Sequence, residues 1–208
     1  MAIVSKSEEY FIAANLLTWD SGPQKPNPAN LNPGFYVDPS SGVRATVVPV
    51  DQQQNVQEDV CLPARFPCNV DVGHLLLTAN NRDAAPIHIE FSGDGVFALG
   101  SYAVSKWRPV QNPDGSIKLN ANGLPVGVAY TASLYVRLMG SGPDDWIPAS
   151  ASQGHTGDIW SPVNPSFAPF VGCKVTAGDK IVAARFDMGH GQDGQFNPVG
   201  ITNLWFYA

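Results

Sequence analysis

Apolar and polar side chains alternate with a period of two along much of the chain after residue 43. In the segment TASLYVRLM (131–139), four apolar residues fall on one face, while Tyr135 and Arg137 fall on the other. Since side chains point alternately to the two faces of a β-strand, this pattern predicts strands with one buried face. We expect strands at residues 44–50, 72–79, 86–91, 95–104, 128–139, 180–187 and 200–208.

The N-terminal segment has a different pattern. Ser5 and Glu8 stand at the spacing of a helix-capping box, and apolar residues from Tyr10 to Leu17 recur close to the helical period. We therefore expect one short helix over residues 6–17. The alternative is a strand, because the same residues also fit one.

Proline and glycine mark the connections. Residues 20–34 hold four prolines, which lack the N–H that a helix or a central strand requires, so this stretch is predicted to be an extended surface arm or loop. In NPDG (112–115), Pro113 and Gly115 favour a tight turn, and the residues around it predict a projecting hairpin. The stretch 140–170 reads as a long loop.

The elements together predict an all-β protein. Strands are short, connections run from 8 to 20 residues, and no long helix follows residue 20, so the class is an antiparallel β-sandwich with a jelly-roll-like arrangement. Hydrophobic residues make up 44% of the 208 positions, which is enough for a sizeable core. We expect residues 1–208 to form a single domain.

Charge limits the range of partners. Charged residues are only 14% of the chain, the formal net charge is -6, and the 12 Lys and Arg residues form no run, which argues against nucleic-acid binding. No stretch approaches the roughly 18 apolar residues of a membrane span. A surface with few charges repels its own copies weakly, so we expect a homo-oligomer.

The N-terminus and the cysteines bear on the compartment. The first residues lack a basic start, a long apolar run and a cleavage site, so we expect synthesis in the cytoplasm without a signal peptide. Leaderless export and assembly into a particle are the alternatives. Cys61, Cys68 and Cys173 are predicted to be reduced, buried thiols, and a Cys61–Cys68 disulfide is the alternative for an exported protein.

Two tryptophans in Pro/Gly-rich stretches are candidate ligand-binding residues. Trp146 follows Asp144 and Asp145, and Trp160 follows Asp158. Sugar rings stack on aromatic side chains while carboxylates accept hydrogen bonds from their hydroxyls, so these five residues predict a glycan site. The alternative is that both tryptophans pack the long loop from beneath.

Two glycine-containing loops combine imidazole and carboxylate groups. His155 precedes Asp158 in QGHTGD, and His190 precedes Asp193 in DMGHGQDG, which begins with Asp187. Such groups are ligands for Zn²⁺ or a redox metal, which activates water at an open coordination position. Ca²⁺ is a further possibility where two loops converge. The alternative is that both segments are solvated turns.

Three hypotheses for the function follow. The first is a non-enzymatic recognition module, oligomeric, with glycans as ligands bound on aromatic-bearing loops. The second is a metal-dependent enzyme that uses the His and Asp residues of loops 153–158 and 187–193. The third is a structural subunit of a particle or inclusion, favoured by the low charge and the proline-rich arm.

Overall fold

A computed structural model describes most of the chain. The described residues are 2–19, 24, 32–48, 56–60, 74–78, 86–105, 109–157, 166–188 and 199–208. They form strands and a single 3₁₀ turn. The elements are β1 (Ile3–Ser5), η1 (Glu8–Phe11), β2 (Asn15–Leu17), β3 (Gly34–Val37), β4 (Arg44–Val48), β5 (Val56–Val60), β6 (His74–Thr78), β7 (Ile87–Phe91), β8 (Ala98–Ser105), β9 (Ala129–Leu138), β10 (Ile147–His155), β11 (Phe170–Val175), β12 (Ile181–Asp187), β13 (Val199–Ile201) and β14 (Leu204–Tyr207).

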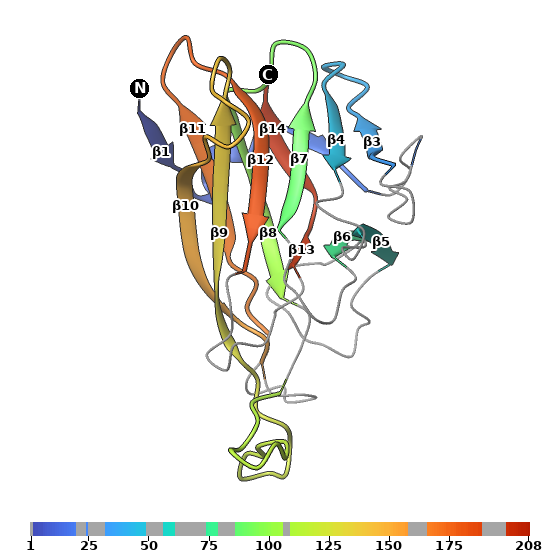
Figure 1. Ribbon diagram of the computed structural model, residues 1–208, viewed down its shortest axis with the longest axis vertical. Helices are drawn as coiled ribbons and strands as arrows, with labels where there is room; N and C mark the ends of the chain where they lie inside the picture. The colour runs from blue at the N-terminus through green and yellow to red at the C-terminus, as the bar shows by residue number, and fades with distance from the viewer. Residues whose placement is uncertain are drawn as a thin grey trace.

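The strands form two antiparallel sheets that lie face to face (Figure 1). The six-stranded sheet has the order β10-β9-β12-β7-β4-β3, and the eight-stranded sheet has the order β1-β11-β8-β13-β6-β5, with β14 between β8 and β2. At one edge a hydrogen bond of 3.1 Å between the Ser5 and Ser150 hydroxyls joins β1 to β10. The predicted all-β sandwich is confirmed, and the jelly-roll arrangement stays a prediction.

The core lies between the two sheets. The six-stranded sheet contributes Leu134 and Phe186, and the eight-stranded sheet contributes Leu99 and Phe206, all with 0% exposure. Cys173 is also buried in this core and forms no disulfide, and burial raises the pKa of its thiol to about 12. Cys173 is therefore the inert buried thiol that the sequence predicts. Cys61 and Cys68 lie outside the described residues.

The predicted strands are confirmed, with one subdivision. Each of the seven predicted ranges overlaps an observed strand, and the range 200–208 overlaps two, β13 and β14. The break falls at Thr202, whose carbonyl accepts a 2.6 Å hydrogen bond from Trp19 Nε1 in the core. A buried indole N–H needs a hydrogen-bond acceptor, and the break between β13 and β14 provides one in the Thr202 carbonyl.

The N-terminal helix prediction is wrong over most of its length. Residues 8–11 form a single 3₁₀ turn, and β2 then pairs with β14. Ser5 does not cap a helix, because it lies in β1 opposite Cys173. Phe11 is 2% exposed and lies against the glycines of β8 and β11, so packing on the sheet outweighs the local helical pattern.

The reading of residues 140–170 as a long loop is also wrong. β10 occupies nine residues of it and forms the edge of the six-stranded sheet beside β9. Its register shifts between Pro148 and Ser150, which is where a strand tolerates proline. Among the described strands β10 pairs with β9 alone, and its small polar sequence does not show a strand pattern.

The predicted hairpin is confirmed. The Gly115 N–H donates to the Asn112 carbonyl at 2.9 Å, and Gly115 has a φ of 83°. The hairpin projects from the end of the sandwich opposite the two termini (Figure 1).

Two further predictions remain open. The predicted arm at residues 20–34 lies largely outside the described residues. The prediction that residues 1–208 form a single domain stays a prediction.

Candidate functional site

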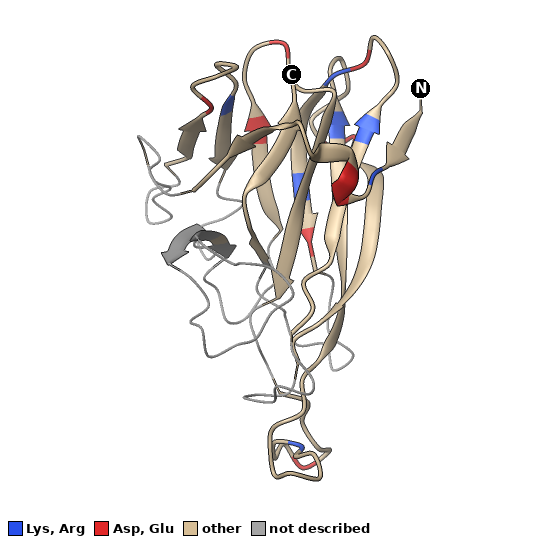
Figure 2. Cartoon of the chain, turned by 180° about the vertical axis from the view of Figure 1, so that it is seen from behind, with Lys and Arg blue, Asp and Glu red and all other residues tan. Residues whose placement is uncertain are grey.

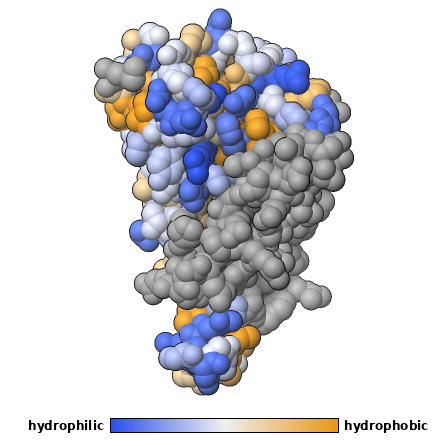
Figure 3. All heavy atoms as spheres, viewed as in Figure 1, coloured by the Kyte–Doolittle hydropathy of each residue, from blue (hydrophilic) through white to orange (hydrophobic). Residues whose placement is uncertain are grey.

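The outer face of the six-stranded sheet carries ionisable side chains on three neighbouring strands. His88 and Glu90 on β7, Arg185 on β12 and Arg137 on β9 are partly exposed, while the residues on either side of each are buried. The expected orientation of Arg137, away from the apolar face of its strand, is confirmed. Figure 3 looks onto this side of the molecule, where hydrophilic side chains gather on the described surface.

The strand register brings these side chains together. Ala183 lies opposite Glu90 on one side and opposite Arg137 on the other. Adjacent strands are about 4.8 Å apart, so a long arginine side chain can reach over the small Ala183 to the second strand. Arg137 Nη2 donates to Glu90 Oε1 at 3.1 Å. Ala183 is fully buried, so the ion pair crosses the sheet over a covered methyl group.

The same arginine holds the loop between β9 and β10. Arg137 Nη1 donates to the Pro143 carbonyl at 3.1 Å. Within the loop, the Asp145 carboxylate accepts a 2.7 Å hydrogen bond from the Gly142 N–H, and Gly140 adopts a φ of 83°. These contacts close the loop into a tight turn. They fix the position of Trp146, the residue that follows.

Trp146 lies over the ionisable side chains. Its ring centroid is 5.1 Å from that of His88, with the two rings nearly perpendicular at 85°. The guanidinium carbons of Arg137 and Arg185 lie 5.6 and 6.0 Å from the Trp146 ring centroid. These distances are in the range of cation–π attraction, which helps to hold the indole over the sheet.

A cavity of about 390 Å³ is lined by Trp146, by its loop and by side chains of the sheet. Its volume is within the range of small-molecule sites, roughly 300–1,000 Å³. Two prolines and the indole supply its apolar surface, and five ionisable side chains supply its polar groups. The lining residues are Pro86, His88, Glu90, Arg137, Pro143, Asp144, Trp146 and Arg185.

His88 is held in its neutral form. Burial lowers its pKa; the nearby Glu90 carboxylate acts in the opposite direction, and the two guanidinium groups of Arg137 and Arg185 lower the pKa further. His88 Nε2 lies 3.5 Å from Glu90 Oε1 and is buried without a hydrogen-bond partner among the described residues. His88 therefore adds an aromatic, uncharged wall to the cavity at neutral pH.

Arg185 differs from Arg137 in having no acidic partner among the described residues. No hydrogen bond or ion pair joins its guanidinium to another described residue, and its Nε is buried and unsatisfied. A buried polar group without a protein partner is uncommon in folded proteins, and it leaves this donor to water or to a ligand. The register places Arg185 between His88 and Tyr135 on the two adjacent strands.

The predicted glycan-binding residues have separate positions in the structure. Trp146 and Asp144 line the cavity, with Asp144 exposed at its rim. Asp145 instead closes the loop through its hydrogen bond to Gly142. Asp158 and Trp160 lie outside the described residues.

The described members of the predicted metal site lie apart. His155 ends β10, where its ring stacks on Phe167 at 6.0 Å, and Asp187 ends β12. Asp187 is level with Ala151 across β9, so strand and residue spacings put it roughly 16 Å from His155. No three His, Cys, Asp or Glu side chains of the described ranges could hold a metal ion together. His190 and Asp193 lie outside those ranges, and the metal site stays a prediction.

Sequence reasoning missed the charged half of the cavity. His88, Glu90 and Arg185 occupy alternate positions in strands that the pattern does predict. That alternation could have revealed their orientation, because charged residues that stand between apolar residues in a strand point to its outer face. The pairing of β7, β12 and β9 brings them together, and pattern alone does not reveal pairing.

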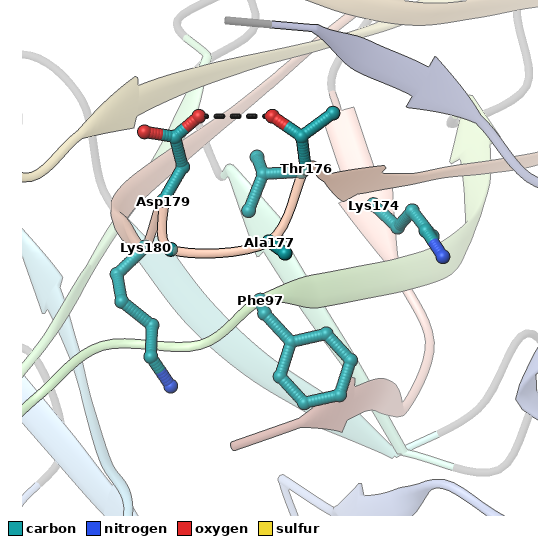
Figure 4. A pocket seen from close by; sticks show the side chains of 8 residues that line it. Phe97, Lys174, Thr176, Ala177, Asp179 and Lys180 are labelled. Carbon is teal, nitrogen blue, oxygen red and sulfur yellow. Dashed lines mark hydrogen bonds between the residues drawn. The ribbon is translucent and has the colours of Figure 1, made fainter.

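A second cavity, of about 310 Å³, lies beside the loop between β11 and β12. Figure 4 shows Phe97 below this loop, between Lys174 and Lys180, with the Thr176–Asp179 hydrogen bond on the far side of the loop from the ring. Lys180 Nζ lies 5.7 Å from the Phe97 ring centroid. The buried unpartnered polar atoms of the described residues include none in this cavity.

The outer face of the eight-stranded sheet is aromatic. Gly100 and Gly172 are paired on adjacent strands, and added Cβ atoms there would lie 2.5 and 2.7 Å from the Phe170 ring, so the two glycines form a floor for it. Phe170 in turn contacts Tyr102 and Trp205, with ring centroids 5.3 and 5.9 Å away. Figure 2 shows few charged residues on this side. Those near the acidic η1 turn include Lys6 and Lys174, whose amines lie over the Tyr10 ring.

Comparison with protein-family models, with curated proteins and with solved structures finds no match. Among the described residues, no helix has the length and apolar character to cross a membrane. The geometry of the site is therefore the basis for assigning a function.

Proposed function

We propose that the protein is a non-enzymatic recognition module that binds glycans in the cavity beneath Trp146. The observation that carries the proposal is the position of this indole, which covers a cavity with polar groups on its walls. Sugars present apolar ring faces and several hydroxyls, and they bind where an aromatic surface stands beside a few placed polar groups.

The two carboxylates that line the cavity can accept hydrogen bonds from a sugar, and Arg137 holds the walls in position. Asp144 is exposed at the rim and is free to accept hydrogen bonds from sugar hydroxyls. Glu90, whose side chain is 44% exposed, offers a second acceptor while it stays paired with Arg137. Arg137 donates hydrogen bonds to both Glu90 and the Pro143 carbonyl, so the sheet and loop sides of the cavity are held in position before a ligand binds. This lowers the entropic cost of binding.

The test is a glycan array with wild-type protein and the variants Trp146→Ala and Phe167→Ala. Phe167 is 43% exposed and packs beside His155 on a different part of the surface, so its removal is a matched control for the loss of an aromatic side chain. We expect Trp146→Ala to weaken binding by about 2 kcal/mol, roughly 30-fold, as for a central aromatic contact. The Phe167→Ala variant should bind as the wild type does.

Thermal melting shows whether each variant is folded, and Trp146→Phe retains an aromatic ring if Trp146→Ala is unstable. Glycan binding that Trp146→Ala and Trp146→Phe leave unchanged would place the site elsewhere. An array on which the folded wild type binds no glycan would refute the proposal.

Assembly into a homo-oligomer is a second candidate, favoured by the apolar residues around the aromatic face of the eight-stranded sheet. Ile12 is 86% exposed directly after η1, and Leu16, opposite Trp205 on the adjacent strand, is 43% exposed. Exposed apolar residues beside aromatic ones are typical of protein contacts. A second copy of the chain is the proposed partner.

Light scattering at several concentrations tests the assembly. We expect a wild-type oligomer and a monomer for the Ile12→Lys/Leu16→Lys double variant. Ile117→Lys, on the projecting hairpin where Ile117 is 47% exposed, is the matched control and should remain oligomeric. A wild type that is monomeric at every concentration would contradict this candidate.

A further inference from the structure

We infer that the glycan bound beneath Trp146 carries a carboxylate, as a uronic acid does, and that Arg185 receives it. This inference rests on the proposed function and adds the chemical class of the ligand. It follows from the unequal pairing of the two arginines in the cavity.

The charge of Arg137 is already compensated. One terminal nitrogen of its guanidinium donates to Glu90 Oε1 and the other to the Pro143 carbonyl, both at 3.1 Å. Its side chain is only 16% exposed. An incoming anion would have to compete with Glu90 for this guanidinium, so Arg137 acts as a positioning residue for the loop that carries Trp146.

The charge of Arg185 is not compensated by any described residue. Its Nε is buried, so water cannot reach one side of the guanidinium. Its terminal nitrogens are not among the buried unpartnered atoms, and the side chain lines the cavity, so they keep donors available there. A partly dehydrated cation binds an anion more strongly than a fully hydrated one, because part of the desolvation cost has been incurred on folding.

The neighbouring charges favour a ligand with a single negative charge. Glu90 and Arg137 compensate one another and His88 is neutral, so among the described lining residues a phosphate with nearly two charges would meet one uncompensated cation, Arg185, and the Asp144 carboxylate. A carboxylate carries one charge and matches the planar donor geometry of a guanidinium. The Trp146 ring centroid is 6.0 Å from the Arg185 guanidinium carbon, so the indole lies beside the sugar ring to which the carboxylate is attached.

Calorimetric titration with matched sugars tests the inference. The probes are glucuronate and galacturonate, the neutral sugars glucose and galactose, and glucose 6-phosphate. The proteins are the wild type, Arg185→Gln and Arg44→Gln; Arg44 lies on the same sheet, 3.8 Å from the centre of the Phe35 ring, and is the matched control. We expect at least one uronate to bind the wild type ten-fold or more tightly than its neutral parent.

This preference should disappear in Arg185→Gln, persist in Arg44→Gln and weaken as NaCl is raised. If Arg185→Gln does not fold, the salt dependence and Arg185→Lys, which keeps the charge and should keep part of the preference, replace it. Equal binding of neutral and acidic sugars would overturn the inference and leave the proposed function standing. Tighter binding of glucose 6-phosphate than of either uronate would overturn the carboxylate assignment. Failure of all sugars to bind, on this assay and on the glycan array, would overturn both.

Discussion

The replacement of Asp38 by Asn is predicted to lower the free energy of unfolding by about 2 kcal/mol at pH 7. Asp38 is 5% exposed in the turn after β3, and its Oδ2 accepts hydrogen bonds from the Ser40 and Ser41 hydroxyls, from the Ser41 N–H and from Asn15. Asn15 belongs to β2 of the other sheet, so the carboxylate joins the two sheets at this end.

The effect on stability follows from the pKa of Asp38. Burial alone would raise this pKa, but the hydrogen bonds outweigh it and lower the pKa from 3.8 to about 2. At about 1.4 kcal/mol per pKa unit, the ionised carboxylate contributes about 2 kcal/mol to the free energy of unfolding. Because the folded pKa is the lower one, this contribution is present above about pH 4 and is lost as the pH falls towards 2.

Urea unfolding of Asp38→Asn, of wild type and of the control Asp94→Asn measures this contribution. Asp94 is an exposed acid in the turn after β7. We expect Asp38→Asn to lose about 2 kcal/mol at pH 7, equivalent to about 4–8 °C in melting temperature for a chain of this length, and the loss to shrink towards pH 2. Equal stabilities of the two variants at pH 7, or a deficit that is the same at pH 2, would contradict this contribution of the Asp38 carboxylate.

Three further predictions follow from the packing and the site. Gly100→Ala should lower the free energy of unfolding by about 1–3 kcal/mol, since the new Cβ would lie 2.5 Å from Phe170 Cζ. An unchanged urea midpoint would show that the Phe170 ring does not need a glycine beneath it. The lowered pKa of His88 means that the unfolded chain takes up a proton first, so stability should fall as the pH drops below about 6.5, and His88→Gln should reduce that slope in melts at pH 5 to 7.5. Elemental analysis of dialysed, untagged protein tests the predicted metal site of His155, Asp187, His190 and Asp193: one retained equivalent of Zn²⁺ or Ca²⁺ would support it, and a metal-free protein would count against the metal-dependent enzyme.

The sequence predicts the strands whose two faces differ clearly. β7 and β9 bury every second residue, and β12 does so apart from the consecutive buried pair Ala183 and Ala184, so their apolar and polar positions alternate and the strands can be predicted. β10 lies at an edge and buries little, so Pro148 and the small polar residues around it hide it. The N-terminal segment fails for a different reason, because apolar residues from Tyr10 to Leu17 recur close to the helical period, yet Phe11 packs on the glycines of the eight-stranded sheet and Leu17 is part of β2.

Half of the candidate site was within reach of the sequence. Trp146 and Asp144 stand together in a loop, and their chemistry suggests a sugar site without knowledge of the fold. His88 and Arg185 are about a hundred residues apart in the chain and meet only because β7 pairs with β12. The absence of an acidic partner for Arg185 among the described residues, on which the ligand class depends, is a fact about three-dimensional packing.

The most direct measurement is nuclear magnetic resonance of ¹⁵N-labelled protein titrated with the tightest-binding uronate. Two side-chain signals report on the site, the Trp146 indole N–H and the Arg185 Nε–H, whose burial slows its exchange with water. We predict that both signals shift with the same dissociation constant, while the signal of the Trp205 indole on the opposite sheet does not shift. Shifts at Trp205 with Trp146 and Arg185 unmoved would contradict it.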